Sequence, residues 1–109
     1  MSVAIADGGR GIPTLSPVTQ TITTTGIGAQ IAVAKLDDGA KFAVNVGAPT
    51  GTVNSMGVQI ENAADSSVLG FAYYPGGPCR ITKPAGVANI QLNCTSFFGT
   101  GSIGVTVES

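Results

Sequence analysis

The sequence contains no histidine and no tryptophan, and only 10% of its 109 residues are charged, against about 25% in typical soluble domains. The absence of histidine excludes Ser-His and Cys-His nucleophilic systems and removes the commonest transition-metal ligand. The acidic residues are too dispersed along the chain to predict a glycosidase-like carboxylate pair. We therefore expect no enzymatic activity, no metal and no cofactor.

Charge and hydropathy also limit the partners. The net charge is −1 and the five basic residues form no cluster, so nucleic acid is not expected to bind. No apolar run approaches the length of a membrane span. The start, MSVAIADGG, lacks the basic and apolar regions of a secretory signal. Either the chain begins here and stays in the cytoplasm, which Met1 and Ser2 favour, or a signal has been removed.

What the chain does contain is typical of β-structure. Apolar residues make up 43% of the sequence, and they alternate with polar or small residues at the period of two that indicates strands. Eight segments show this pattern: 18–25, 29–36, 41–46, 56–61, 67–74, 79–83, 87–94 and 103–108. No segment has helical periodicity. We predict an all-β fold, a β-sandwich or jelly-roll-like domain over residues 18–109, preceded by an extended, Gly- and Pro-punctuated arm over residues 1–17.

Two local pairings are predicted from turns. Asp37-Asp38-Gly39 has the Asp-Gly chemistry of a tight turn and predicts a hairpin between segments 29–36 and 41–46. This turn explains the two aspartates better than a Ca²⁺ site does. Segments 79–83 and 87–94 are predicted to form a second hairpin with Cys79 and Cys94 on one face. The two cysteines could bridge there, but in a cytoplasmic protein free thiols are favoured.

One stretch of sequence occurs twice. NSMGVQIEN, residues 54–62, resembles GSIGVTVES, residues 101–109, at an offset of 47, and the preceding strands correspond at an offset of 48. We interpret this as two four-stranded units related by pseudo-symmetry, with a closed barrel as the alternative. Glu61 and Glu108 occupy matching places and are interpreted as outward-facing acids that blunt sheet edges rather than as a catalytic pair.

The aromatic residues are the candidate contacts. Leu69, Phe71 and Tyr73 share one side of their segment and are predicted to lie in the core. Tyr74, Phe97 and Phe98 are predicted to provide exposed contacts near loops, because such aromatics often anchor interfaces. The alternative is that they close the ends of the sandwich. In the arm, the predicted contacts with a neighbour or partner are Val3, Ile5, Arg10, Ile12 and Leu15.

The short His-free chain, the Gly/Pro-punctuated arm, the Thr- and Ala-rich strands and the scarcity of charge together resemble the small β-rich decoration, or cement, proteins of tailed-phage capsids. This resemblance covers the whole chain but rests on no diagnostic motif. It implies a homo-oligomer, with a trimer favoured, that binds the major capsid protein on the outer surface of the virion after synthesis in the host bacterial cytoplasm. It also implies that the arm reaches capsid subunits or adjacent copies.

A second function fits the same composition. A phage tail or fibre domain, or a carbohydrate-binding β-sandwich, would recognise a cell-surface glycan through Tyr74, Phe97 and Phe98 together with Asn89 and Asn93. Glycan-binding proteins usually present a planar aromatic platform. The absence of tryptophan counts against this alternative.

Overall fold

The computed structural model describes residues 12–109, and within them it contains nine strands and no helix. The strands are β1 (Val18–Ile22), β2 (Gly26–Ile27), β3 (Ile31–Ala32), β4 (Lys41–Val46), β5 (Val53–Asn62), β6 (Val68–Tyr74), β7 (Cys79–Thr82), β8 (Asn89–Gly99) and β9 (Ile103–Glu108). The all-β prediction is confirmed. The first predicted strand is shorter than expected, and the second is reduced to the two residues of β3.

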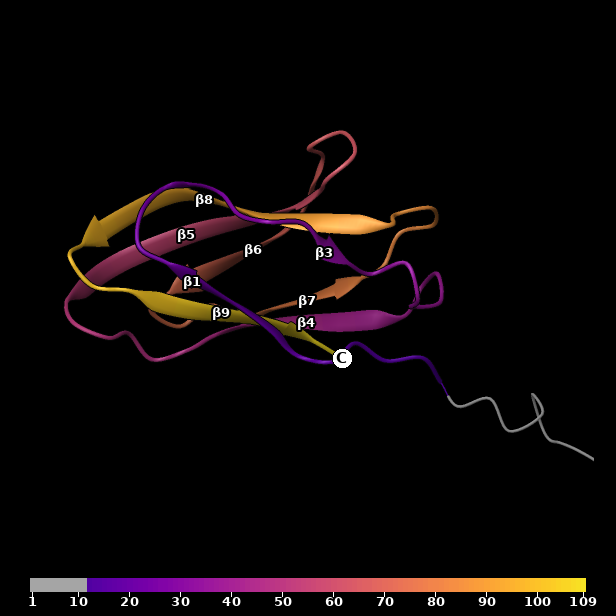
Figure 1. Ribbon diagram of the computed structural model, residues 1–109, viewed down its shortest axis with the longest axis horizontal. Coiled ribbons are helices and arrows are strands. Elements are labelled where there is room, and N and C mark those ends of the chain that lie inside the picture. Colours follow the sequence, from indigo (N-terminus) through magenta and orange to yellow (C-terminus); the bar gives the residue numbers. More distant parts are fainter. Residues whose placement is uncertain (1–11) are drawn as a thin grey trace, which may run out of the picture.

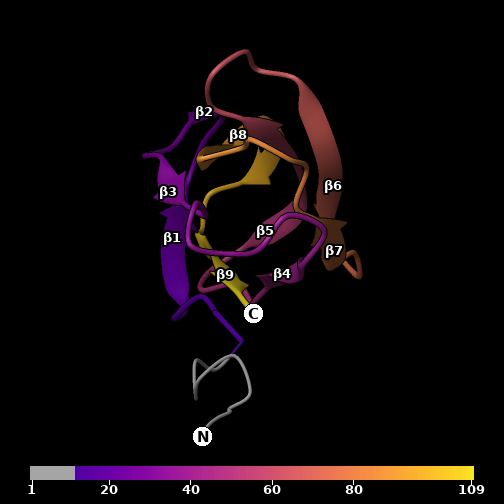
Figure 2. The same cartoon turned by 90° about the vertical axis from the view of Figure 1, so that its right-hand side faces the viewer.

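The strands form two antiparallel sheets that face each other (Figures 1 and 2). One sheet has the order β1-β9-β4-β7, and the other has the order β2-β8-β5-β6 with β3 also paired to β8. We call them the four-stranded and the five-stranded sheet. Figure 2 shows β1 and β3 along one side of the sandwich and β6 and β7 along the other.

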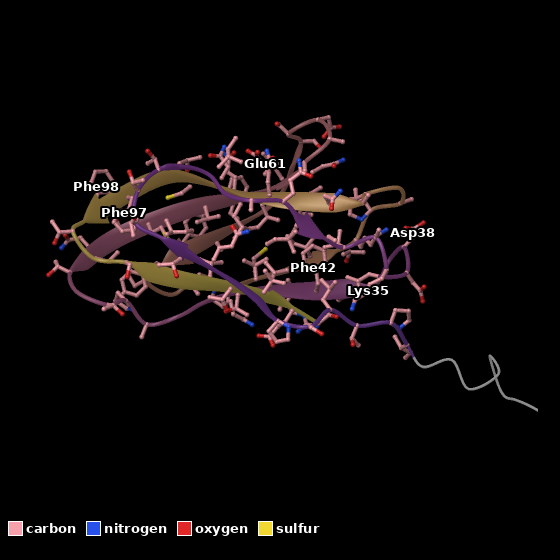
Figure 3. All side chains as sticks on the ribbon, in the orientation of Figure 1. Lys35, Asp38, Phe42, Glu61, Phe97 and Phe98 are labelled. Carbon is pink, nitrogen blue, oxygen red and sulfur yellow. The ribbon has the colours of Figure 1, made fainter. Side chains whose placement is uncertain are left out.

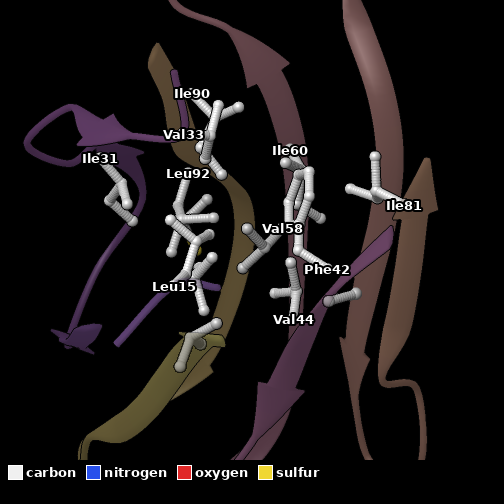
Figure 4. Packing of buried hydrophobic residues seen from close by; sticks show 14 of the residues in the cluster. Leu15, Ile31, Val33, Phe42, Val44, Val58, Ile60, Ile81, Ile90 and Leu92 are labelled. Carbon is white, nitrogen blue, oxygen red and sulfur yellow. The ribbon is translucent and has the colours of Figure 1, made fainter. Parts of the chain in front are cut away.

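The core lies between the sheets (Figure 4). Outside β6, the inward positions predicted from the sequence alternation are buried or partly buried. The side chains with almost no exposed surface include Phe42, Met56, Ile60, Ile90, Leu92, Ile103, Val33, Val44, Val58, Val105 and Val107. Because most of these are aliphatic, packing depends on β-branched and leucine side chains rather than on aromatic rings. The core therefore forms without tryptophan and with one fully buried phenylalanine.

The internal repeat is built into the sheets as one strand pair used twice. In the four-stranded sheet β4 pairs with β9, and in the five-stranded sheet β8 pairs with β5. Adding 48 to the residue numbers of β4 and subtracting 47 from those of β9 converts the β4–β9 register into the β8–β5 register. The matching pairs are Val44↔Val107 with Leu92↔Ile60, and Val46↔Val105 with Cys94↔Val58. The repeated sequence is therefore repeated architecture.

The equivalence extends to the outer strands. Strand β1 pairs with β9 as β6 pairs with β5, and β7 pairs with β4 as β3 pairs with β8. Even a backbone hydrogen bond beside β3 recurs beside β7, from Val33 N to Ala88 O and from Lys83 N to Ala40 O. One unit is thus β3-β4-β5-β6 and the other is β7-β8-β9 completed by β1. The N-terminal strand supplies the fourth strand of the C-terminal unit.

Both predicted hairpins are wrong. Gly39 has a φ of +84°, so the predicted turn exists, but β3 before it pairs with β8 whereas β4 after it pairs with β7 and β9. The turn crosses from one sheet to the other. The same holds for β7 and β8, which lie in different sheets. Turn chemistry fixes a reversal of the chain, but not whether the two flanking strands share a sheet.

The two cysteines consequently do not face each other across a hairpin, and both are free thiols, as favoured from the sequence. Cys94 is buried, and its Sγ donates to the carbonyl oxygen of Ser96 at 3.3 Å. Burial raises the pKa of this thiol above its ordinary value, because the thiolate would lose its solvation. Cys94 is therefore a core residue rather than a nucleophile.

Candidate interaction surface

The predicted arm contacts divide into three groups. Val3, Ile5 and Arg10 lie outside the described residues. Ile12 is 83% exposed and remains available to a partner. Leu15 is only 6% exposed and packs in the core of its own domain (Figure 4). Its backbone N donates to Ser109 Oγ at 2.8 Å, which ties the start of the domain to the C-terminus.

The predicted loop aromatics lie on strands. Tyr74 ends β6 and Phe97 lies in β8, and both are paired with Met56 on the core side of the five-stranded sheet. Both are partly buried and pack against the core, which fits the alternative that they close the sandwich. Phe98 is 62% exposed and is the one residue of this predicted trio that points outward.

The exposed aromatic pair on β6 was not predicted. Phe71 is 47% exposed and Tyr73 50%, and their rings stack with centroids 6.3 Å apart and planes 11° apart. Their prediction as core residues is wrong because Gly70 and Ala72 occupy the inward positions. A Cβ at Gly70 would lie 2.8 Å from Cys79 Sγ and 3.2 Å from the Ile81 side chain, so the interior has no room for a larger residue at this position.

Phe71, Tyr73 and Phe98 lie on the same outer side of the five-stranded sheet, and we call this surface the aromatic face. Figure 3 labels Phe98 on this side, together with Glu61. The cross-strand neighbours place small or amide side chains between the rings. Tyr73 is opposite Gly57, which is opposite Ser96, and Phe71 is opposite Gln59, which is opposite Asn93.

Charge is nearly absent from this sheet. Its five strands contain one charged residue, Glu61, whereas the four strands of the other sheet contain three, Lys41, Arg80 and Glu108. Glu61 was interpreted from the sequence as an outward-facing acid at a sheet edge. This interpretation is wrong, because its side chain is buried. The aromatic face therefore presents rings and amides.

Glu61 is held by two amide donors. Its carboxylate oxygens accept from Asn93 Nδ2 at 3.0 Å and from Gln91 Nε2 at 2.8 Å. These hydrogen bonds, Asn93 first, hold the pKa of Glu61 below its ordinary value of 4.5 and outweigh the opposing effect of burial. At the equivalent place in the other sheet, Asn45 Nδ2 donates to an oxygen of Glu108 at 3.0 Å in an exposed setting. The two glutamates are thus equivalent structural acceptors on different sheets and form no catalytic pair.

The pseudo-symmetry provides an internal control for the aromatic pair. Thr19 pairs with Thr106, and Thr21 with Gly104, in the way that Phe71 pairs with Gln59 and Tyr73 with Gly57. Threonines on β1 therefore hold the positions that the aromatics hold on β6. Because the fold accepts small β-branched residues there, the scaffold does not require the rings. The segments 18–22 and 70–74 share no identical residue, so the sequence alone gives no signal of this equivalence.

Asp38 of the predicted turn belongs to an ion pair. Lys83 is buried at the position equivalent to Val33, and its Nζ lies 2.6 Å from Asp38 Oδ1. The hydrogen bond and charge of Lys83 hold the pKa of Asp38 below its ordinary value. In residues 12–109, no three His, Cys, Asp or Glu residues are grouped so that they could hold a metal ion. Asp38 therefore has a structural role.

No helix in this part of the chain is long and apolar enough to cross a membrane. Comparisons with family models, with curated proteins and with solved structures gave no match. The aromatic face is thus the feature from which a function can be argued.

Proposed function

We propose that this protein is a decoration, or cement, protein of a tailed-phage capsid. It binds the major capsid protein on the outer surface of the head as an oligomer, with a trimer favoured, and stabilises the head against the internal pressure of packaged DNA. Its place of action is the virion, after synthesis in the bacterial cytoplasm. The observation that carries the proposal is the exposed Phe71–Tyr73 pair on a sheet almost without charge.

The physical argument is one of burial. Centres of protein interfaces are enriched in aromatic residues and depleted of charge, and a few buried aromatic anchors supply most of the binding energy. Burying apolar surface contributes roughly 25 cal/mol per Å². Two half-exposed rings in fixed strand positions lose little further conformational freedom on binding. A contact of this kind also depends little on ionic strength, because no exposed ion pair contributes to it.

The test uses expanded heads assembled from major capsid protein alone, mixed with purified protein and separated by sedimentation. The double variant Phe71→Thr/Tyr73→Thr places on β6 the residues that β1 carries at equivalent positions, and we expect it to bind at least about tenfold more weakly. The matched control, Thr19→Ser/Thr21→Ser on the other face, should bind as the wild type does. Two results would contradict the proposal. One is decoration of the heads by the double variant to the same extent as by the wild type, and the other is removal of the wild-type protein from the heads by moderate salt.

A second candidate function, recognition of a neutral glycan, is favoured by the geometry of the same face. The Phe71 and Tyr73 rings are nearly parallel, and Gln59 and Asn93 place amides in the adjoining row. Aromatic rings beside hydrogen-bonding amides can contact the apolar face and the hydroxyls of a sugar ring. Titration with neutral oligosaccharides, followed by NMR, separates the two functions. Saturable binding that Tyr73→Thr abolishes, without any binding to heads, would favour the glycan.

A further inference from the structure

The two long sides of the sandwich differ although their strands are equivalent. On one side β6 lies against β7, because Gly70 leaves space for Cys79 and Ile81. On the other side the equivalent strands are β1 and β3, with Val18 in the place of Gly70 and Ile31 in the place of Ile81. Val18 thus has a side chain where Gly70 has none, and β1 and β3 approach each other less closely than β6 and β7 do.

The second side contains an apolar groove of about 400 Å³, within the size range of protein ligand sites, about 300–1,000 Å³. It is lined by Leu15, Ser16, Val18, Gln30, Ile31, Ala32 and Lys35. Val18 is 41% exposed, so apolar surface is left in contact with water. On the equivalent β6–β7 side the strands pack together and the corresponding space is closed. The fold itself therefore does not require an open groove between β1 and β3.

The first of the described residues lie beside this groove. The foremost, Ile12, is 83% exposed and lies three positions before Leu15, which lines the groove. Figure 1 shows the chain between them leading away from the sandwich. Eleven further residues precede Ile12, and fully extended they span at most about 35–40 Å. Among them Val3 and Ile5 alternate with Ala4, so in an extended chain both side chains lie on one face.

We propose that Val3 and Ile5 of one copy dock in the β1–β3 groove of a second copy. Three observations favour this occupant: the groove is apolar, the chain leaves its own domain in an outward direction, and the segment is long enough to reach a neighbour. The inference rests on the oligomer of the proposed function and deepens it, since it names the contact by which copies of the protein associate.

Disulfide trapping with purified protein tests the contact without capsids. In a background with Cys79→Ala and Cys94→Ala, one chain carries Ile5→Cys and a second, separately tagged chain carries Ala32→Cys at an exposed position. Mild oxidation of the mixture should give a disulfide-linked heterodimer on a non-reducing gel. The matched control replaces Ala32→Cys with Thr82→Cys, which is exposed on β7 at the closed side. Circular dichroism should show that every variant keeps its β-structure.

A heterodimer yield no higher than that of the Thr82→Cys control would overturn the proposal. So would a single chain with both Ile5→Cys and Ala32→Cys that oxidises to a monomer, because the arm would then occupy its own groove. Sedimentation equilibrium gives an independent measurement: Val3→Ser/Ile5→Ser should weaken self-association at least about tenfold. Because no capsid is present, failure here leaves the capsid-binding result unaffected, and the reverse is also true.

Discussion

The four-stranded and five-stranded sheets share a framework, yet their outer faces differ in chemistry. At two equivalent positions the first has Thr19 and Thr21, and the second has Phe71 and Tyr73. The strands of the first sheet also carry three charged residues where those of the second carry one. Because the backbone pairing is the same, these differences cannot be requirements of folding. A duplicated scaffold thus separates residues that hold the structure from residues free to bind.

The interior has diverged less than the surface. Inward positions on the central strands are apolar in both units, and the difference between Val33 and its equivalent Lys83 is accommodated by the ion pair with Asp38. A buried ammonium requires a partner, and Asp38 provides it. An exposed position can change alone, which is why the outer faces could become different.

The largest expected effects are in the core and test whether the units are truly equivalent. Ile60→Ala and Val107→Ala remove buried side chains at matching positions, and we expect each to lower the free energy of unfolding by roughly 1–4 kcal/mol, with Ile60→Ala at the upper end. Chemical denaturation followed by circular dichroism measures this. Val58→Ala and Val105→Ala form the second matched pair. If both variants in either sheet left the free energy of unfolding unchanged, the two units would not be equivalent in the core.

Much of the fold could be predicted from the sequence because alternation is a local signal. The core strands are recognisable by their period of two, and the repeat between 54–62 and 101–109 indicated the duplicated strand pair. Sheet membership could not be predicted, because the turns at Gly39 and at 83–88 have the chemistry of hairpins but join opposite sheets. That choice is made by long-range pairing, as in β3 with β8.

The candidate site was harder to predict because side-chain size does not determine which face is inward. On β6 the larger residues Phe71 and Tyr73 suggested the core, but close packing of β7 requires Gly70 and Ala72 there. Phe98 was predicted as exposed, and it is. Phe97 was placed in a loop, but it continues β8, because a register shift in the β5–β8 pair keeps the strand paired beyond Gly57.

A smaller effect is expected at the two equivalent glutamates. The folded pKa of Glu61 lies below its ordinary value of 4.5, so its ionised form stabilises the fold above that pH, and the contribution is lost as the pH falls through the folded pKa. Glu61→Gln should lower the melting temperature at pH 7, because one amide donor loses its acceptor, and should flatten the decline in melting temperature below about pH 4.5. Glu108→Gln, in the exposed pair with Asn45, should change the melting temperature at pH 7 less. Equal changes in melting temperature for the two variants would show that burial of Glu61 and its amide donors adds no stability.

The smallest effect on stability is expected where the effect on binding is largest. Phe71→Thr/Tyr73→Thr gives β6 the side chains of β1, and the reciprocal Thr19→Phe/Thr21→Tyr gives β1 those of β6. Since both pairs are exposed and Thr, Phe and Tyr all favour strands, each double variant should keep its free energy of unfolding within about 1 kcal/mol of the wild type. The first should lose its partner, while the second should keep it. If Phe71→Thr/Tyr73→Thr unfolded the protein instead, the rings would be part of the scaffold, and their exposure would no longer argue for a binding surface.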